Sequence, residues 1–283
     1  MKFFMARAGA IALLALLVLP TSGAYAGQKK KGDQGSGSTS LSDEPKPGDQ
    51  KAGGPAVSKE ELAAYKAVYE ARGGDPAKLV ELGEAFVMKY PDSIYVGPVY
   101  SDLANAYLHT NQPDKMIDAG TKALDKNPDN VDVLPMMSWA LARRVSSQTP
   151  DGPAQLAKAA GYGKHGIDLI SSMPKPVSLD DAIFTKTKNE LLSMCHDGIG
   201  VAAVKTGKYD LAVAELTQSV QLSSAPDPVD YYLIGVSNEV GSHFTDASAA
   251  FTKCSTEGPM QAQCKAGLED TKKKAKDNLE APK

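Results

Sequence analysis

The 283-residue sequence predicts an all-α protein built from stacked pairs of helices. Apolar residues recur with helical spacing over most of residues 59–276, and proline or glycine separates successive segments. Aromatic residues make up only 6% of the chain, while Ala and Leu are abundant, which suits close helix-on-helix packing. Runs that alternate apolar β-branched residues with polar ones are absent, so we expect essentially no sheet.

The N-terminus has the composition of an export signal. Lys2 and Arg7 precede an apolar run over residues 11–19, and Ala24-Tyr25-Ala26 forms a small-x-small cleavage site. The apolar run is shorter than the roughly 20 residues that a membrane-spanning helix needs, so we expect cleavage and no anchor. No cysteine directly follows this run, so the lipoprotein pattern is absent. We therefore expect residues 1–26 to be a signal peptide, the mature chain to lack a transmembrane segment, and the protein to be periplasmic or secreted.

Residues 27–58 are predicted to form a disordered linker. This stretch is rich in Lys, Gly, Ser and Pro and contains almost no core-forming side chain. Such a composition buries too little apolar area to offset the entropy of ordering the chain. Its charges nearly balance, so we interpret it as a tether and not as a recognition motif. Residues 277–283 are expected to be a short disordered tail, and residues 59–276 a single helical domain of about five pairs plus a cap.

The net charge argues against a nucleic-acid partner. Loss of Lys2 and Arg7 with the signal peptide takes the formal charge from −3 to −5. Nucleic-acid binding normally requires a clustered basic face, which a mildly acidic chain does not favour. We therefore expect no nucleic-acid partner.

One repeat is preserved particularly well, between Gly97 and Pro128. Its predicted first helix places Ala104 at a helix crossing and Tyr107 one turn later, and its second helix begins at Pro113, where proline is favoured. This order of residues resembles a tetratricopeptide (TPR) unit, a helix–turn–helix that repeats every ~34 residues. The resemblance implies a right-handed TPR-type helical solenoid.

Three further units support the same resemblance. The preceding unit opens its second helix at Pro76 and ends with Tyr90-Pro91-Asp92-Ser93, an exit similar to that of TPR proteins of the bacterial envelope. Two units near the C-terminus place Gly200 and Gly235 at their helix crossings. Residues 259–276 are predicted to form a helix that caps the solenoid.

The middle of the chain departs from the repeat. Residues 131–145 predict a regular helix, but its partner over residues 153–170 contains three glycines that lower helix propensity. After two prolines, Ser178-Leu179-Asp180-Asp181 has the pattern of a helix N-terminus, and the helix that follows extends to about Thr206. We expect irregular spacing between the two halves.

Two cysteines flank a predicted turn at Glu257-Gly258-Pro259. Cys254 and Cys264 lie at similar distances from this turn, so an antiparallel hairpin brings them opposite each other. An exported protein meets an oxidising compartment, which favours a disulfide. The alternative is two small buried residues that pack without a bond. Cys195 is expected to be a buried thiol on an apolar helix face.

No catalytic, metal or cofactor motif is recognisable. The four histidines are scattered, and neither a zinc-protease motif, a phosphate-binding loop nor a nucleophile elbow occurs. Cys195-His196 lacks the upstream cysteine of a haem-attachment motif. We therefore expect no enzymatic activity, no metal and no cofactor.

The TPR resemblance also implies where a partner binds. TPR proteins bind peptides on a concave face formed by the first helix of each pair. The matching positions here are Ser101, Asn105, His109, Trp139, Arg143, Asp197, Val201, Lys205, Tyr232 and Val236. The basic residues of a carboxylate clamp are not at the matching positions, so recognition of a free C-terminus is not expected.

Two further expectations concern individual residues of this set. Trp139 is either a binding anchor or a core residue. Arg143 and Lys205 are expected to reach solvent, since charged heads are rarely buried, and to tolerate charge reversal without loss of stability.

Three functions fit the sequence. The first is an exported scaffold that binds another protein, in cell-envelope assembly or maintenance. The second is a carrier or receptor for a small molecule or glycan that uses the irregular central region. The third is an accessory subunit of an enzyme or secretion complex.

Overall fold

The computed structural model describes residues 41, 46–48, 57–177, 179–256 and 258–280. The predicted signal peptide and most of the predicted linker lie outside these residues. Within the described ranges the chain forms eleven helices and no strand, which confirms the predicted all-α helical solenoid. The helices are α1 (Lys59–Glu70), α2 (Pro76–Lys89), α3 (Val96–His109), α4 (Pro113–Lys126), α5 (Val133–Arg144), α6 (Gly152–Ser172), α7 (Asp181–Lys205), α8 (Tyr209–Leu222), α9 (Pro228–Val240), α10 (Phe244–Cys254) and α11 (Gln261–Glu280).

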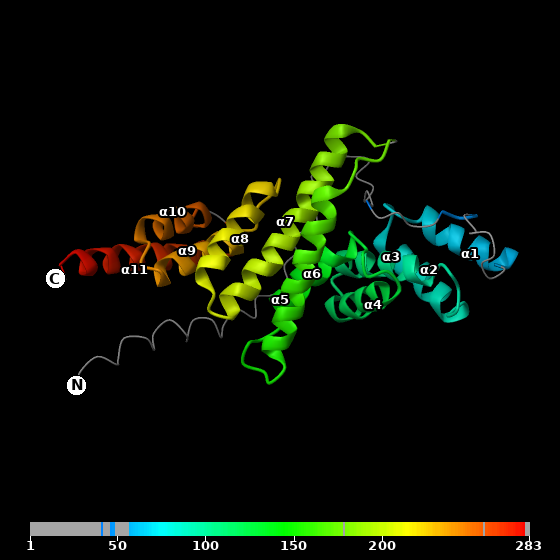
Figure 1. The fold of residues 1–283 in the computed structure, drawn as a ribbon, viewed down its shortest axis with the longest axis horizontal. Helices are drawn as coiled ribbons and strands as arrows, with labels where there is room; N and C mark the ends of the chain where they lie inside the picture. The colour runs from blue at the N-terminus through cyan, green and yellow to red at the C-terminus, as the bar shows by residue number, and fades with distance from the viewer. Residues whose placement is uncertain (1–40, 42–45, 49–56, 178, 257, 281–283) are drawn as a thin grey trace.

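Consecutive helices pack as pairs that stack along one axis (Figure 1). The α1–α2 pair lies at one end, α9 and α10 lie near the other, and α11 follows them. The odd-numbered helices α3, α5, α7 and α9 contact one another in sequence across the pairs. This is the helix–turn–helix arrangement that the TPR-like spacing predicts.

Side-chain capping marks the starts of α1, α2, α7 and α9. Ser58, Asp75, Asp180 and Asp227 each accept a hydrogen bond from a backbone N–H of the first turn. The predicted starts at Pro76 and Pro113 are confirmed. The predicted capping helix is present as α11 and extends to Glu280, past the expected end at residue 276.

Glycines set how closely the paired helices approach. A Cβ on Gly200 would lie 2.5 Å from Cγ of Leu216 on α8, and one on Gly235 would lie 2.6 Å from Cε1 of Phe251 on α10. Both glycines therefore occupy helix crossings, as the sequence predicts.

The central helices are longer than those of the other pairs, with 21 residues in α6 and 25 in α7. Both stand out from the stack in Figure 1. The predicted irregular spacing is present, and the glycines of α6 have a packing role. A Cβ on Gly163 would lie 2.7 Å from Oγ of Ser138 on α5, and one on Gly166 would lie 2.7 Å from Sγ of Cys195 on α7. Contacts with α5 and α7 therefore offset the low helix propensity of α6.

Buried side chains form two clusters. The larger one runs through the whole stack, from Tyr65 on α1 to Cys264 on α11. The smaller one joins Ile170 of α6, Cys195 of α7 and Val131 before α5 to Leu41. Leu41 belongs to the stretch predicted as a disordered linker, yet its side chain is buried against the helical domain.

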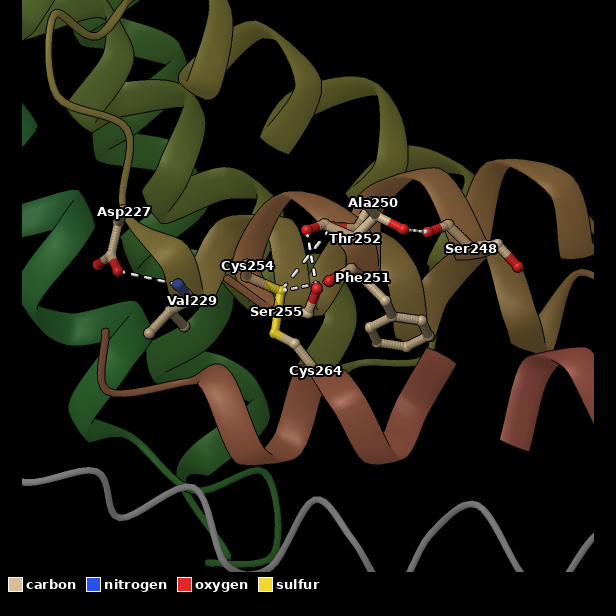
Figure 2. Close-up of a disulfide and its surroundings, with 9 residues drawn as sticks. All are labelled: Asp227, Val229, Ser248, Ala250, Phe251, Thr252, Cys254, Ser255 and Cys264. Carbon is tan, nitrogen blue, oxygen red and sulfur yellow. Dashed lines mark hydrogen bonds between the residues drawn. A yellow bond between two sulfur atoms is a disulfide. The ribbon is translucent and has the colours of Figure 1, made fainter. Parts of the chain in front are cut away.

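The predicted disulfide between Cys254 and Cys264 is present, with the two Cα atoms 5.8 Å apart. It joins the last residue of α10 to the first turn of α11, beside the buried ring of Phe251 (Figure 2). Cys195 is a free buried thiol, as predicted, and burial raises its pKa. Among the described residues, no helix combines the length and apolar character needed to cross a bilayer.

Candidate functional site

The ten residues predicted to bind a partner all lie on α3, α5, α7 and α9. We call the surface that these four helices form the first-helix face. Ser101, Asp197, Val201 and Tyr232 are buried, whereas Asn105, Trp139, Arg143, Lys205 and Val236 are partly exposed and His109 is exposed. Only part of the predicted set can therefore touch a partner directly.

A charged cluster occupies the centre of this face. The guanidinium of Arg143 lies 2.7 Å from Asp197 Oδ2 on α7, 3.1 Å from Asp227 Oδ2 and 3.2 Å from Asp230 Oδ1 on α9. The side chain of Arg143 is only 19% exposed, and that of Asp197 is fully buried. One arginine on α5 thus holds together three consecutive first helices.

Lys205 adds a second cation beside this cluster. Its Nζ donates hydrogen bonds of 2.8 Å to the backbone carbonyls of Arg143 and Val145 at the C-terminal end of α5. A cation there satisfies carbonyls that lack helical partners and interacts favourably with the helix dipole. Burial, with a smaller contribution from the nearby Arg143, lowers the pKa of Lys205 to about 8.

These contacts correct one expectation from the sequence. Arg143 does not extend freely into solvent, and both cations make hydrogen bonds inside the domain. Reversal of the two charges would place carboxylates beside three aspartates and beside helix carbonyls. The expected tolerance to charge reversal is therefore not supported, because reversal would leave buried carboxylates without a compensating cation.

Burial is the largest influence on the pKa values of Asp197 and Asp230. Desolvation raises the pKa of Asp197 to about 6, against the opposing effect of the Arg143 guanidinium. Desolvation and the negative charge of Asp197 raise the pKa of Asp230 well above its ordinary value. Three carboxylates therefore surround one guanidinium, and burial disfavours the charged forms of Asp197 and Asp230.

Hydroxyl groups on both α7 and α8 extend the hydrogen bonds of this cluster. Ser219 on α8 donates to Asp230 Oδ2 at 2.8 Å, and Ser193 on α7 donates to the backbone carbonyl of Ser219 at 3.0 Å. All of these polar atoms are buried, so each hydrogen bond avoids an unsatisfied group.

Trp139 packs against Arg143 of this cluster. It is partly exposed, and the Arg143 guanidinium lies 5.4 Å from its ring centroid. This cation–π contact fixes the orientation of the indole relative to α5. Trp139 is thus neither a fully buried core residue nor a fully exposed one, because part of its side chain packs on the cluster and part is exposed.

The sequence reasoning missed Asp227, Asp230 and Ser219. Asp227 precedes Pro228, which marks a helix N-cap, and its Oδ1 accepts a hydrogen bond from the backbone N–H of Val229 (Figure 2). Asp230 has helical spacing to the buried residues Ile234 and Ser237, and that periodicity places its carboxylate on an interior face. This helical spacing is the sequence signal from which the burial of Asp230 could have been predicted.

The predicted residues at the other end of the face are less closely connected. Ser101 Oγ accepts a hydrogen bond of 3.3 Å from Asn130 Nδ2, which ties α3 to the start of α5. Asn105 and His109 follow Ser101 at helical spacing with increasing exposure. This end of the face therefore offers polar side chains with increasing access to solvent.

Two surface depressions lie near the turn between α2 and α3. One is lined by residues 89–94 with Val57 and Glu61, and the other by Pro91, Val96, Tyr100, Lys122, Asp125 and Lys126. Both are shallow and open. In the described part of the chain, no group of three His, Cys, Asp or Glu side chains is arranged to hold a metal ion.

Solved structures that are similar to this chain include the following three. A thermophilic TPR protein of Thermus thermophilus shares 15% identity at a TM-score of 0.43, over 74% of this chain and 95% of its own. PilW, described as a widely conserved type IV pilus biogenesis factor, shares 15% identity at a TM-score of 0.47, over 80% of this chain and 97% of its own. The MamA RS-1 ArsTM double mutant shares 12% identity at a TM-score of 0.44, over 70% of this chain and 94% of its own.

No protein-family model and no curated protein sequence matches the chain. All three TM-scores are below 0.5, so the assignment as a TPR-like helical solenoid rests on the chain's own helix order, pairing and crossings.

Proposed function

We propose that the mature protein is an exported scaffold that binds a protein or peptide through the first-helix face. The observation that carries this proposal is the partly exposed indole of Trp139, held on the Arg143 cluster in the middle of that face. Tryptophan and arginine are enriched among the residues that dominate binding energy at protein interfaces. Preorganised side chains also lose less conformational entropy when a partner binds.

The charged cluster suits a scaffold because it fixes the positions of α5, α7 and α9 relative to one another. Asn105 and His109 extend the accessible surface on one side of Trp139, and Val236 extends it on the other. A partner that lies along this face would therefore contact polar, then aromatic, then apolar side chains. An extended or helical segment has the length to contact all three.

The predicted export of the protein determines the compartment in which we propose that it acts. The predicted signal peptide and the disulfide both suit an oxidising compartment, and we propose a role in cell-envelope assembly or maintenance. The alternative of a small-molecule carrier that uses the central region has less support. There, Gly163 and Gly166 bring α6 into close contact with α5 and α7.

Site-specific photo-cross-linking in the producing cell tests the proposal. A photo-reactive side chain is placed at Asn105 or Val236 on the first-helix face, or at Asp118 or Gln218 on α4 and α8 as controls. Asp118 and Gln218 are exposed on second helices. We expect one cross-linked partner from the first two positions and none from the controls. The same partner from all four positions, or from the controls alone, would refute the assignment of the face.

A binding measurement with the captured partner follows. Trp139→Ala should weaken binding by about 2 kcal/mol or more if the indole is a central contact. Met88→Ala is the control, because Met88 is an exposed apolar residue on α2, a second helix. Equal affinity of both variants and the unmodified chain would exclude Trp139 as an anchor.

A further inference from the structure

Leu41 makes a two-point contact with the helical domain. Its side chain is 7% exposed and packs in the smaller cluster with Val131, Ile170 and Cys195. Its backbone N–H donates a hydrogen bond of 3.1 Å to Asp132 Oδ1, across 91 positions in the sequence. An aliphatic side chain in a pocket, together with a main-chain hydrogen bond beside it, is a common way to recognise an extended peptide.

The pocket belongs to the fold of the helical domain. Ile170 of α6 and Cys195 of α7 are fully buried, and Asp132 is the residue that precedes the first turn of α5. The backbone N–H of Asp132 donates to Asn130 Oδ1 at 3.0 Å, which fixes this corner. We therefore expect the pocket to keep its shape when Leu41 is absent.

The contact of Leu41 is small compared with the apolar surface around it. Among the described residues before Val57, Leu41 is the one that is buried, while Lys46 and Gly48 are exposed. Met173, Leu179 and Phe184, on the α6–α7 hairpin, are partly buried and pack against the same cluster. Neighbouring apolar residues that stay partly exposed on a protein surface commonly mark an interaction site.

We propose that this pocket on α5, α6 and α7 is a peptide-binding site, and that Leu41 is its resident ligand. An external peptide of the same chemistry displaces it. The partner is an extended segment with a leucine-like side chain for the pocket and a free N–H for Asp132. Further apolar residues of the partner lie over Met173, Leu179 and Phe184. A tethered ligand competes at an effective concentration of roughly millimolar, so a partner must exceed the single-residue contact of Leu41 to displace it.

Peptide binding to the full mature chain tests the proposal. The probe is a fluorescent peptide with the sequence of residues 37–45, and fluorescence anisotropy measures its affinity. Leu41→Ser in the full chain removes the tethered competitor, so the probe should bind this variant at least about tenfold more tightly than the unmodified chain. Leu279→Ser is the matched control, because Leu279 is 86% exposed on α11. This control should bind the probe as weakly as the unmodified chain.

Two further measurements separate specific from general binding. A probe in which Leu41 is replaced by serine should bind neither variant, because the pocket recognises the aliphatic side chain. Asp132→Ala, combined with Leu41→Ser, should weaken probe binding about fivefold or more, as expected for loss of a hydrogen bond to a charged group. Circular dichroism confirms that each variant is folded, and Leu41→Ala is the milder replacement if Leu41→Ser is not.

Several results would overturn the proposal. Equal affinity of the probe for the Leu41→Ser and unmodified chains would exclude competition by Leu41. Absence of binding to the folded Leu41→Ser chain at about 1 mM probe would exclude a peptide site of useful strength. An unmodified chain that is a dimer in light scattering and becomes a monomer with Leu41→Ser would show that Leu41 occupies the pocket of a second copy.

Discussion

Asp197 lies fully buried on α7 with its carboxylate 2.7 Å from the guanidinium of Arg143 on α5. Since Arg143 also contacts Asp227 and Asp230, this pair is the centre of a network that spans three helices. Removal of one partner from such a network leaves buried charges without compensation, and that loss costs more free energy than the intact network contributes.

Arg143→Met should therefore lower the free energy of unfolding by about 3–5 kcal/mol. Urea denaturation followed by circular dichroism measures the loss. The neighbouring residue provides a matched control, since Arg144 pairs with Asp114 at 2.5 Å on the exposed surface. Arg144→Met should cost about 0–1 kcal/mol. Similar losses for both variants would show that the Arg143 network is not a major source of stability.

The stability of the protein should decrease between pH 5 and pH 7.5. The folded-state pKa of Asp197 is raised to about 6 and that of Asp230 is raised as well, so the folded state binds more protons than the unfolded state in this range. Linkage then requires that this stabilisation is lost as pH rises through the folded-state pKa, by about 1 kcal/mol for Asp197 alone.

Asp230→Asn tests the origin of this pH dependence. It removes one of the three carboxylates but keeps an oxygen that can accept from Ser219, so stability should vary less between pH 5 and pH 7.5. Asp118→Asn, at an exposed position on α4, should leave the slope unchanged. The measurement is the urea midpoint at several pH values. An unaltered slope in Asp230→Asn would exclude Asp230 as a source of the effect.

Gly200→Ala should lower stability by about 1–3 kcal/mol, because its new Cβ would overlap the side chain and backbone of Leu216. The control is Gly161→Ala on α6, where an added Cβ would meet no atom within 4 Å. That substitution should instead stabilise the protein by about 0.5–1 kcal/mol through better helix propensity. Thermal unfolding distinguishes the two. Stabilisation by Gly200→Ala would contradict the helix crossing described here.

Replacement of both Cys254 and Cys264 by serine should destabilise the protein by about 2–3 kcal/mol, as expected for a disulfide that closes a short loop. Non-reducing peptide mapping of the exported protein should give one linked pair and a free Cys195. Because Cys195 is fully buried, it should react with an alkylating reagent only after denaturation. A bond between Cys195 and either partner would contradict the hairpin between α10 and α11.

The sequence predicted the fold well because most of its signals are local. Pro76 and Pro113 mark helix starts, Gly200 and Gly235 mark crossings, and the turn between Cys254 and Cys264 predicts their pairing. Each signal depends on backbone geometry within a few residues, which sequence patterns report directly.

The charged cluster could not be predicted in the same way. Arg143 and Asp230 are 87 positions apart, and their contact depends on how three separate helices are rotated. The burial of Leu41 is equally non-local, because the pocket is formed by residues far along the chain. The binding role of the ten residues on the first-helix face stays a prediction.

The disulfide makes the two ends of the stack differ in their resistance to local unfolding. In an array where each unit contacts its neighbours, the terminal units are the first to peel away. At the C-terminal end α11 is covalently fastened to α10, whereas at the other end α1 is held by two buried side chains, Tyr65 and Val68. Fraying should therefore begin at α1 and proceed toward the centre, so amide hydrogens of α1 should exchange before those of α10.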